Sequence, residues 1–280
     1  MITRTTAFVA GLIVVAALTT GPAWAAPGDP PGALTFGGMQ RTYVLHVPPG
    51  LQNPSGLVIN LHGAGQTGAI QAGVTNYNAI ADRYGFVVAY PDGIDMSWAD
   101  GRGASVPDRD GVDDVGFLAA LIGQLSRDFG IPPGRVFVTG MSAGAFMANR
   151  LACDRADLVS AVAPVAGTLG VGVACNPSKP VSVLAIHGTD DPVVPFAGGP
   201  MVGRGGPSEI VSAPAMAERW RALDQCPSVP APNPQGFTVS GCAGGTQVEF
   251  VSVNGAGHTW PMNPAVDASA ATGQFFASRV

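Results

Sequence analysis

The chain has 280 residues, of which 46% are hydrophobic and only 12% are charged, and this is enough apolar material to bury a full core. Its 14 basic and 19 acidic side chains give a formal net charge of −5. This acidic balance argues against a nucleic-acid partner, because binding to phosphate backbones depends on basic surfaces.

Met1–Ala25 has the features of a secretory signal peptide. Arg4 makes its start positive, Phe8–Leu18 is apolar, and Ala23-Trp24-Ala25 fits the small-x-small pattern that precedes cleavage. The apolar run is shorter than the roughly 20 residues that a membrane span needs, and no cysteine lies near the cleavage site to carry a lipid. We therefore expect a secreted, extracellular protein with no stable membrane anchor, in which residues 26–280 form a single domain.

All four cysteines lie after this segment, and an even number of cysteines in an exported chain indicates disulfides. Four cysteines allow three pairings. We favour Cys153–Cys175 and Cys226–Cys242, because sequence neighbours close short loops, and each bond would add about 3 kcal/mol on the chain-entropy model. No CxxC or Cys-His spacing supports a metal site.

Strand and helix signals alternate along the first part of the domain. Arg41–Pro48 predicts an early strand, Leu57–Leu61 and Phe86–Tyr90 predict short buried strands, and Asn76–Tyr84 predicts a helix. Asp92–Gly111 is then a polar loop that is too long for a simple connection, and such a loop is often part of a binding site.

The remaining elements continue this alternation. Val112–Phe129 repeats apolar residues at helical spacing, and capping suits Asp113 and Asp114 near its start better than catalysis. The other expected elements are strands over Arg135–Thr139, Ser160–Val165, Val181–Ile186 and Gln247–Val253, and a helix over Pro214–Leu223. This order predicts an α/β fold with a mostly parallel, doubly wound sheet.

The segment Val136–Arg150 carries the pattern Gly140-Met141-Ser142-Ala143-Gly144 between the end of a strand and the start of a helix. A strand that turns into a helix within about four residues strains the central residue and needs glycine on either side. This arrangement would present the Ser142 hydroxyl as a nucleophile. The Ala143 N–H would lie beside it as an oxyanion donor, and a second donor is expected from Gly63 or Ala64 in the turn after Leu57–Leu61.

A nucleophilic serine needs a general base, and the sequence offers four histidines, at positions 46, 62, 187 and 258. His46 lies within a strand, and both His62 and His187 directly precede a glycine, where a histidine ordinarily braces a turn. His258 follows the last strand in a glycine-rich loop. It fits the chain order serine, acid, histidine, so His258 is the expected base.

The acid should follow a strand between Ser142 and His258. Asp190 and Asp191 directly follow Val181–Ile186 and its His-Gly turn. We favour Asp191, because Pro192 fixes the turn after it, while Asp190 stays an alternative, since pattern alone does not separate adjacent carboxylates.

Eight segments together resemble the polyhydroxybutyrate-depolymerase-like esterases, which are related to feruloyl and acetylxylan esterases. They are LHGAGQ (Leu61–Gln66), YPDG (Tyr90–Gly93), WADGR (Trp98–Arg102), VDDVGFL (Val112–Leu118), GMSAGAFMANRLAC (Gly140–Cys153), PVAGTL (Pro164–Leu169), HGTDDPVVPF (His187–Phe196) and GHTWP (Gly257–Pro261). The resemblance spans most of the domain and implies an α/β-hydrolase fold, the triad Ser142, Asp191 and His258, and cysteines paired as above. It also suggests Trp260 as a wall of the substrate cleft.

The chain departs from this family in two places. The motif that commonly continues GHTWPG here reads Pro261-Met262, and no separate polymer-binding domain or linker is present. The second departure makes solid, crystalline polyester a doubtful substrate.

Three functions stay open at this point, none of which needs a metal or cofactor. The first is a serine esterase for hydroxyalkanoate oligomers of the polyhydroxybutyrate-depolymerase type. The second is an esterase for feruloyl or acetyl groups of plant cell walls, in which Trp98 and Trp260 would stack on a sugar or an aromatic acid. The third is a secreted binding protein without activity, and an intact Ser, Asp and His set argues against it. Acyl transfer to an acceptor other than water is a further possibility.

Overall fold

The structure is a computed structural model that describes residues 31–228 and 236–280 as well as Met1. The expected signal peptide, Met1–Ala25, lies outside these ranges apart from its first residue. Among the described residues, no helix is both long enough and apolar enough to cross a membrane.

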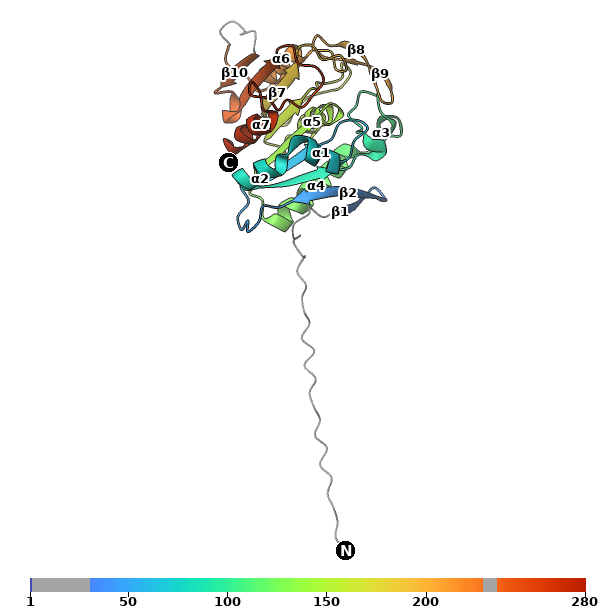
Figure 1. Cartoon of the computed structure of the whole chain (residues 1–280), viewed down its shortest axis with the longest axis vertical. Helices are drawn as coiled ribbons and strands as arrows, with labels where there is room; N and C mark the ends of the chain where they lie inside the picture. Colours follow the sequence, from blue (N-terminus) through green and yellow to red (C-terminus); the bar gives the residue numbers. More distant parts are fainter. Residues whose placement is uncertain (2–30, 229–235) are drawn as a thin grey trace.

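Nine strands of the described ranges form one mixed sheet in the order β1-β2-β4-β3-β5-β6-β7-β11-β10. Figure 1 shows β1 and β2 at one end of the molecule and β10 at the other. The strands are β1 (Pro31–Phe36), β2 (Met39–His46), β3 (Gly56–Leu61), β4 (Phe86–Pro91), β5 (Val136–Met141), β6 (Ala161–Val165), β7 (Ser182–Gly188), β10 (Gly236–Ser240) and β11 (Gln247–Val253). The six strands from β4 to β11 in this order pair in parallel, and β1, β2 and β10 pair antiparallel at the two ends. The predicted mostly parallel sheet is therefore confirmed.

The helices cover both faces of this sheet, as a doubly wound fold requires. They are α1 (Gly68–Thr75), α2 (Tyr77–Tyr84), α3 (Val106–Arg109), α4 (Asp114–Phe129), α5 (Ala143–Asp154), α6 (Ala213–Leu223) and α7 (Ala268–Ala277), with 3-10 turns η1 (Ile94–Met96) and η2 (Ala243–Gly245). One apolar core joins the sheet to α4, α5 and α6, and a second core on the other face joins it to α2 and α7.

The start of α4 explains the two aspartates that the sequence places there. Asp113 caps the helix by accepting the Gly116 N–H at 2.7 Å. Asp114 is buried and pairs with the buried guanidinium of Arg41 at 2.7 Å, so it ties α4 to β2. Both carboxylates therefore have structural partners, and the expected capping role is confirmed for Asp113.

Both predicted disulfides are present, Cys153–Cys175 and Cys226–Cys242. The first attaches the end of α5 to the loop after β6. The sequence patterns did not predict β1, α1, α3, α7, β10 or a separate two-stranded hairpin made of β8 (Gly199–Gly203) and β9 (Gly206–Ile210).

Candidate active site

Ser142 lies at the sharp turn between β5 and α5. Its backbone has φ 55° and ψ −119°, a strained conformation for a residue with a side chain. The turn is held because the Ser142 N–H donates to the Val165 carbonyl at 3.0 Å. Gly144 permits it, since a side chain at this position would collide with the carbonyl oxygen of Leu61. The local geometry is that of the nucleophile elbow expected from the sequence.

Asp191 and His258 are joined by a hydrogen bond of 2.8 Å between the Nδ1–H of His258 and Oδ2 of Asp191. The other carboxylate oxygen accepts the N–H groups of Val193 and Val194, each at 2.8 Å. Burial opposes ionisation of Asp191, but hydrogen bonds from His187, His258 and these two N–H groups outweigh it and hold the pKa of this carboxyl below its usual range. Asp191 is therefore an anion that can orient His258 at every physiological pH.

The neighbouring Asp190 has a different environment. Its side chain is exposed and accepts the hydroxyl hydrogen of Thr189 at 2.9 Å. His187, in contrast, is buried, donates from Nε2 to the Val194 carbonyl at 2.9 Å and lies 3.5 Å from the Asp191 carboxylate. Asp191 rather than Asp190 is thus the partner of His258, and His187 braces the acidic loop.

Ser142, Asp191 and His258 follow the carboxyl ends of β5, β7 and β11. Because these strands belong to the parallel part of one sheet, their carboxyl ends meet at the same edge, where ligands bind in open α/β sheets. The glycine-rich turn after β3 reaches this edge too, since a Cβ added at Gly63 would stand 3.6 Å from the Cβ of Ser142.

The turn after β3, His62-Gly63-Ala64-Gly65, is braced from below by His62. This imidazole is fully buried, accepts the Gly93 N–H at Nε2 at 2.9 Å, and donates from Nδ1 to the Gly63 carbonyl at 2.8 Å. Burial lowers the pKa of His62, so the ring stays neutral and keeps one donor and one acceptor nitrogen. The Gly63 N–H is also engaged, by Oε1 of Gln66 at 3.3 Å.

The two tryptophans expected to face the substrate are both buried. Trp98 has no exposed surface; its indole N–H donates to the His62 carbonyl at 2.9 Å, and its ring lies 4.8 Å from the His62 ring. Trp260 is 5% exposed and donates to the Ser269 hydroxyl at 2.9 Å within the second core. The expectation of substrate stacking is therefore wrong for these side chains as they lie here, because neither ring presents a free face.

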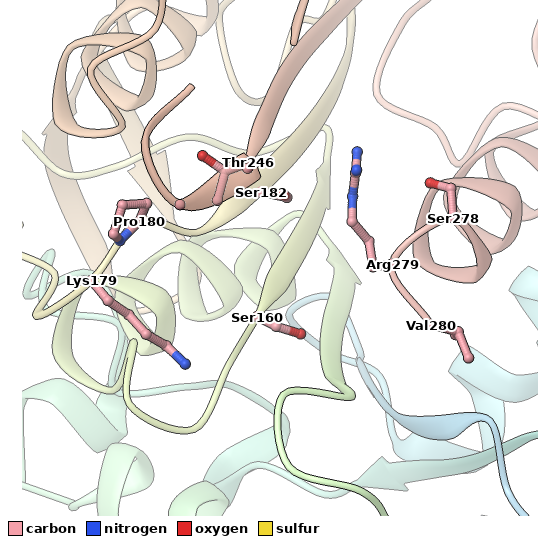
Figure 2. A pocket seen from close by; sticks show the side chains of 10 residues that line it. Ser160, Lys179, Pro180, Ser182, Thr246, Ser278, Arg279 and Val280 are labelled. Carbon is pink, nitrogen blue, oxygen red and sulfur yellow. The ribbon is translucent and has the colours of Figure 1, made fainter. Parts of the chain in front are cut away.

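A large cavity of about 510 Å³ lies elsewhere, at the amino ends of β6 and β7. Figure 2 shows its lining of hydroxyl side chains together with Lys179 and Arg279. None of the expected site residues contributes to it, so its size carries no weight in locating the active site.

The sequence did not predict the hydrogen bonds that hold the turn after β3 in place. Nothing in the pattern linked Trp98 to His62, or Gln66 to Gly63, because these contacts depend on how the loops pack. The one signal available was the placement of His62 directly before a glycine, which indicated a brace without identifying its partners.

Comparisons with known proteins agree with this geometry. The family model for "Esterase PHB depolymerase" matches residues 41–200. A Nocardia uniformis subsp. tsuyamanensis protein named "Putative esterase NocK" is 32% identical over 248 residues, which cover 80% of this chain and 72% of that protein. Feruloyl esterase B of Piromyces equi is 32% identical over 184 residues, and the match covers 62% of this chain but only 34% of that longer protein.

Among solved structures, an acetyl xylan esterase from Aspergillus awamori superposes with a TM-score of 0.61 at 18% identity, covering 86% of this chain and 94% of the other. This likeness establishes the α/β-hydrolase fold. Because the family model covers more than half of the sequence and agrees with the first of these relatives, the chain belongs to the esterase PHB depolymerase family.

Proposed function

We propose that this chain is a secreted serine esterase that hydrolyses carboxylic esters through a covalent acyl-enzyme, with hydroxyalkanoate oligomers as its substrate class. The observation that carries the proposal is the 2.8 Å hydrogen bond between His258 and an ionised Asp191, at the sheet edge where Ser142 is held in a strained turn. Strain and a fixed acid–base pair are features of catalytic sites. The two disulfides support export, because such bonds persist in oxidising compartments.

In the first half of the reaction, Oγ of Ser142 forms a bond to the ester carbonyl carbon while its proton moves to Nε2 of His258. Asp191 stabilises the resulting imidazolium. The tetrahedral intermediate then breaks its bond to the alcohol oxygen, which takes the proton from His258. In the second half, a water molecule gives a proton to His258 and its oxygen forms a bond to the acyl carbon. The bond between this carbon and Oγ of Ser142 then breaks, Oγ takes the proton back from His258, and the acid is released.

The negative charge on the carbonyl oxygen needs donors, and we assign them to the N–H groups of Ala143 and Ala64. Gly63 was the other candidate, but its N–H already donates to Gln66. In a planar trans peptide the Gly63 carbonyl and the Ala64 N–H point in opposite directions. Because His62 holds that carbonyl from below, the Ala64 N–H is directed away from the core.

A second substrate class is suggested by the relatives. Feruloyl esterase B is among the matching proteins, and an acetyl xylan esterase is among the similar structures. The buried positions of Trp98 and Trp260 remove the stacking surfaces that the sequence offered for a ferulate or a sugar, so we rank hydroxyalkanoate esters first.

The test is hydrolysis of hydroxybutyrate oligomers, methyl ferulate and acetylated xylan by the purified protein and by Ser142→Ala. We expect turnover of the oligomers, and a loss of several orders of magnitude in kcat for the variant. Circular dichroism and the melting temperature of the variant control for folding. Near-full activity in Ser142→Ala would refute the mechanism, and no turnover by either protein would favour the binding-protein alternative.

A further inference from the structure

The hairpin β8–β9 lies outside the main sheet and is anchored at both of its ends (Figure 1). At its base, the Val211 N–H donates to the Leu169 carbonyl at 2.9 Å. At its tip, the Gly205 N–H donates to the Ala104 carbonyl at 2.9 Å, and the guanidinium of Arg109 donates to the Gly205 carbonyl. The tip is therefore fixed on the long loop after β4.

Arg204, in the turn of this hairpin, reaches the oxyanion turn. Its Nη1 stands 3.3 Å from the position that a Cβ on Gly65 would occupy. Its Nη2 lies 3.6 Å from Oδ1 of Asp95 in η1. Gly65 ends the turn whose Gly63 lies against Ser142, so the guanidinium stands at the rim of the proposed active site.

Asp95 is placed by a strained backbone. Asp95 and Met96 have φ values of 50° and 51°, and two consecutive left-handed residues other than glycine are uncommon. The Met96 carbonyl accepts the Gly65 N–H at 2.8 Å, which fastens this turn to the oxyanion turn. Strained segments of this kind cluster at ligand-binding sites.

The pair formed by Arg204 and Asp95 is accessible and weak. The two side chains are 41% and 38% exposed, and such surface ion pairs contribute only about 0–1 kcal/mol. A guanidinium has five N–H donors in a planar fork that matches the two oxygens of a carboxylate, whereas the contact with Asp95 involves one oxygen at 3.6 Å. An incoming carboxylate can therefore displace Asp95 at little cost.

We propose that Arg204 binds a carboxylate of the ester substrate, and that Asp95 occupies this guanidinium when substrate is absent. The preferred substrates are then esters that carry a free carboxylate, such as hydroxy-acid oligomers with an open carboxyl end. This inference rests on the proposed function and deepens it, because acetyl groups on a neutral sugar offer no such anion.

The test compares a hydroxybutyrate trimer with a free carboxyl end and the same trimer capped as a primary amide, which is similar in shape but neutral. For Arg204→Gln we expect KM of the free acid to rise about tenfold, as for the loss of a charge-assisted hydrogen bond, while kinetics on the amide change less than twofold. Asp95→Asn should lower KM of the free acid, and asparagine also accepts the left-handed conformation. Both effects should shrink as salt is added.

The binding step can be measured without turnover by calorimetry on Ser142→Ala. A preference for the free acid over the amide that disappears in Ser142→Ala combined with Arg204→Gln supports the inference even if the esterase proposal fails. Equal binding of the two trimers, or an Arg204→Gln effect that is the same on both, overturns it. Hydrolysis of both trimers with no dependence on Arg204 would leave the proposed esterase function standing alone.

Discussion

Two buried aspartates lie at opposite ends of β7 and are held in opposite ways. Asp191, after the carboxyl end, accepts hydrogen bonds from His258, Val193 and Val194, and its pKa is held below the usual range although burial opposes this. Asp224, at the amino end, accepts the Val181 N–H at 3.1 Å. Burial raises the pKa of Asp224 to about 6 and outweighs its hydrogen bonds with Val181 and Thr246.

Hydrogen bonds therefore stabilise the charged form of Asp191, whereas burial disfavours the charged form of Asp224. At the carboxyl edge donors converge on one carboxylate. Positive φ values occur at both edges, at Ser142 near Asp191 and at Gln225 next to Asp224, so strain alone does not separate them. At the amino edge there is a cavity of about 510 Å³ (Figure 2), but among the described residues Asp224 accepts fewer hydrogen bonds than Asp191 does. The proposed active site is therefore marked by directed hydrogen bonds and not by the volume of a cavity.

The difference between the two aspartates is tested most directly by making the same substitution at Asp191 and at Asp224. For Asp191→Asn we expect kcat to fall by about 10³–10⁴, since the amide no longer fixes the tautomer of His258 or stabilises its charged form. Asp224→Asn serves as the matched control and should keep kcat within about twofold. Comparable losses in the two variants would remove the distinction between the two edges.

Variants of His62 test whether catalysis depends on the hydrogen bonds that this side chain makes to the turn after β3. His62→Asn can still donate to the Gly63 carbonyl from the position of Nδ1, whereas His62→Gln can only replace the acceptor at Nε2. We expect kcat to fall about 10²-fold in His62→Gln, as for loss of one oxyanion donor, and clearly less in His62→Asn, with similar KM values.

Thermal melts of both His62 variants provide the control, because each removes a fully buried ring. If kcat of the two variants falls in proportion to their lost stability, His62 only fills space, and the assignment of Ala64 as the oxyanion donor loses its support.

The smallest expected effect is on how the free energy of unfolding depends on pH. Because the folded-state pKa of Asp224 is raised to about 6, its stabilising contribution is complete below the unfolded-state pKa of about 3.9 and is lost as the pH rises to about 6. Asp224→Asn should therefore be more stable than the parent protein at pH 7, by about 1–2 kcal/mol, and this advantage should vanish near pH 4.

The contribution of Asp191 to stability depends on pH in the opposite direction. With a lowered folded-state pKa, its contribution is complete above about pH 4 and is lost only as the pH falls further. Urea denaturation of Asp191→Asn at several acidic pH values should show a loss of stability that is largest at about pH 4 and shrinks as the pH falls further. A loss that grows as the pH falls below about 4 would contradict the assigned direction.

Much of this site could be predicted from the sequence, because the decisive features are local. The elbow around Ser142 is encoded by glycines on either side of one serine. The role of His258 as the base stays a prediction from its position after the last strand. The choice of Asp191 over Asp190 depended on Pro192, and the structure agrees, since only Asp191 bonds to His258.

The remaining features could not be predicted, because they arise from packing between distant segments. A tryptophan in a polar loop suggests a binding surface, yet Trp98 turns inward to meet His62, 36 residues earlier. The β8–β9 hairpin has few apolar residues and three glycines at its turn, so its sequence did not indicate strands. Arg204 and Asp95 are more than a hundred residues apart in the sequence, so no local pattern could predict their contact.

The close packing of Gly144 on Leu61 has a consequence for changing this enzyme in the laboratory. No side chain fits between α5 and the end of β3, so we expect substitutions of Gly144 to disrupt the elbow. In the β8–β9 hairpin, by contrast, Val202 is 76% exposed, and we expect this position to accept replacement without disturbing the core. A library intended to alter substrate choice therefore belongs on that hairpin.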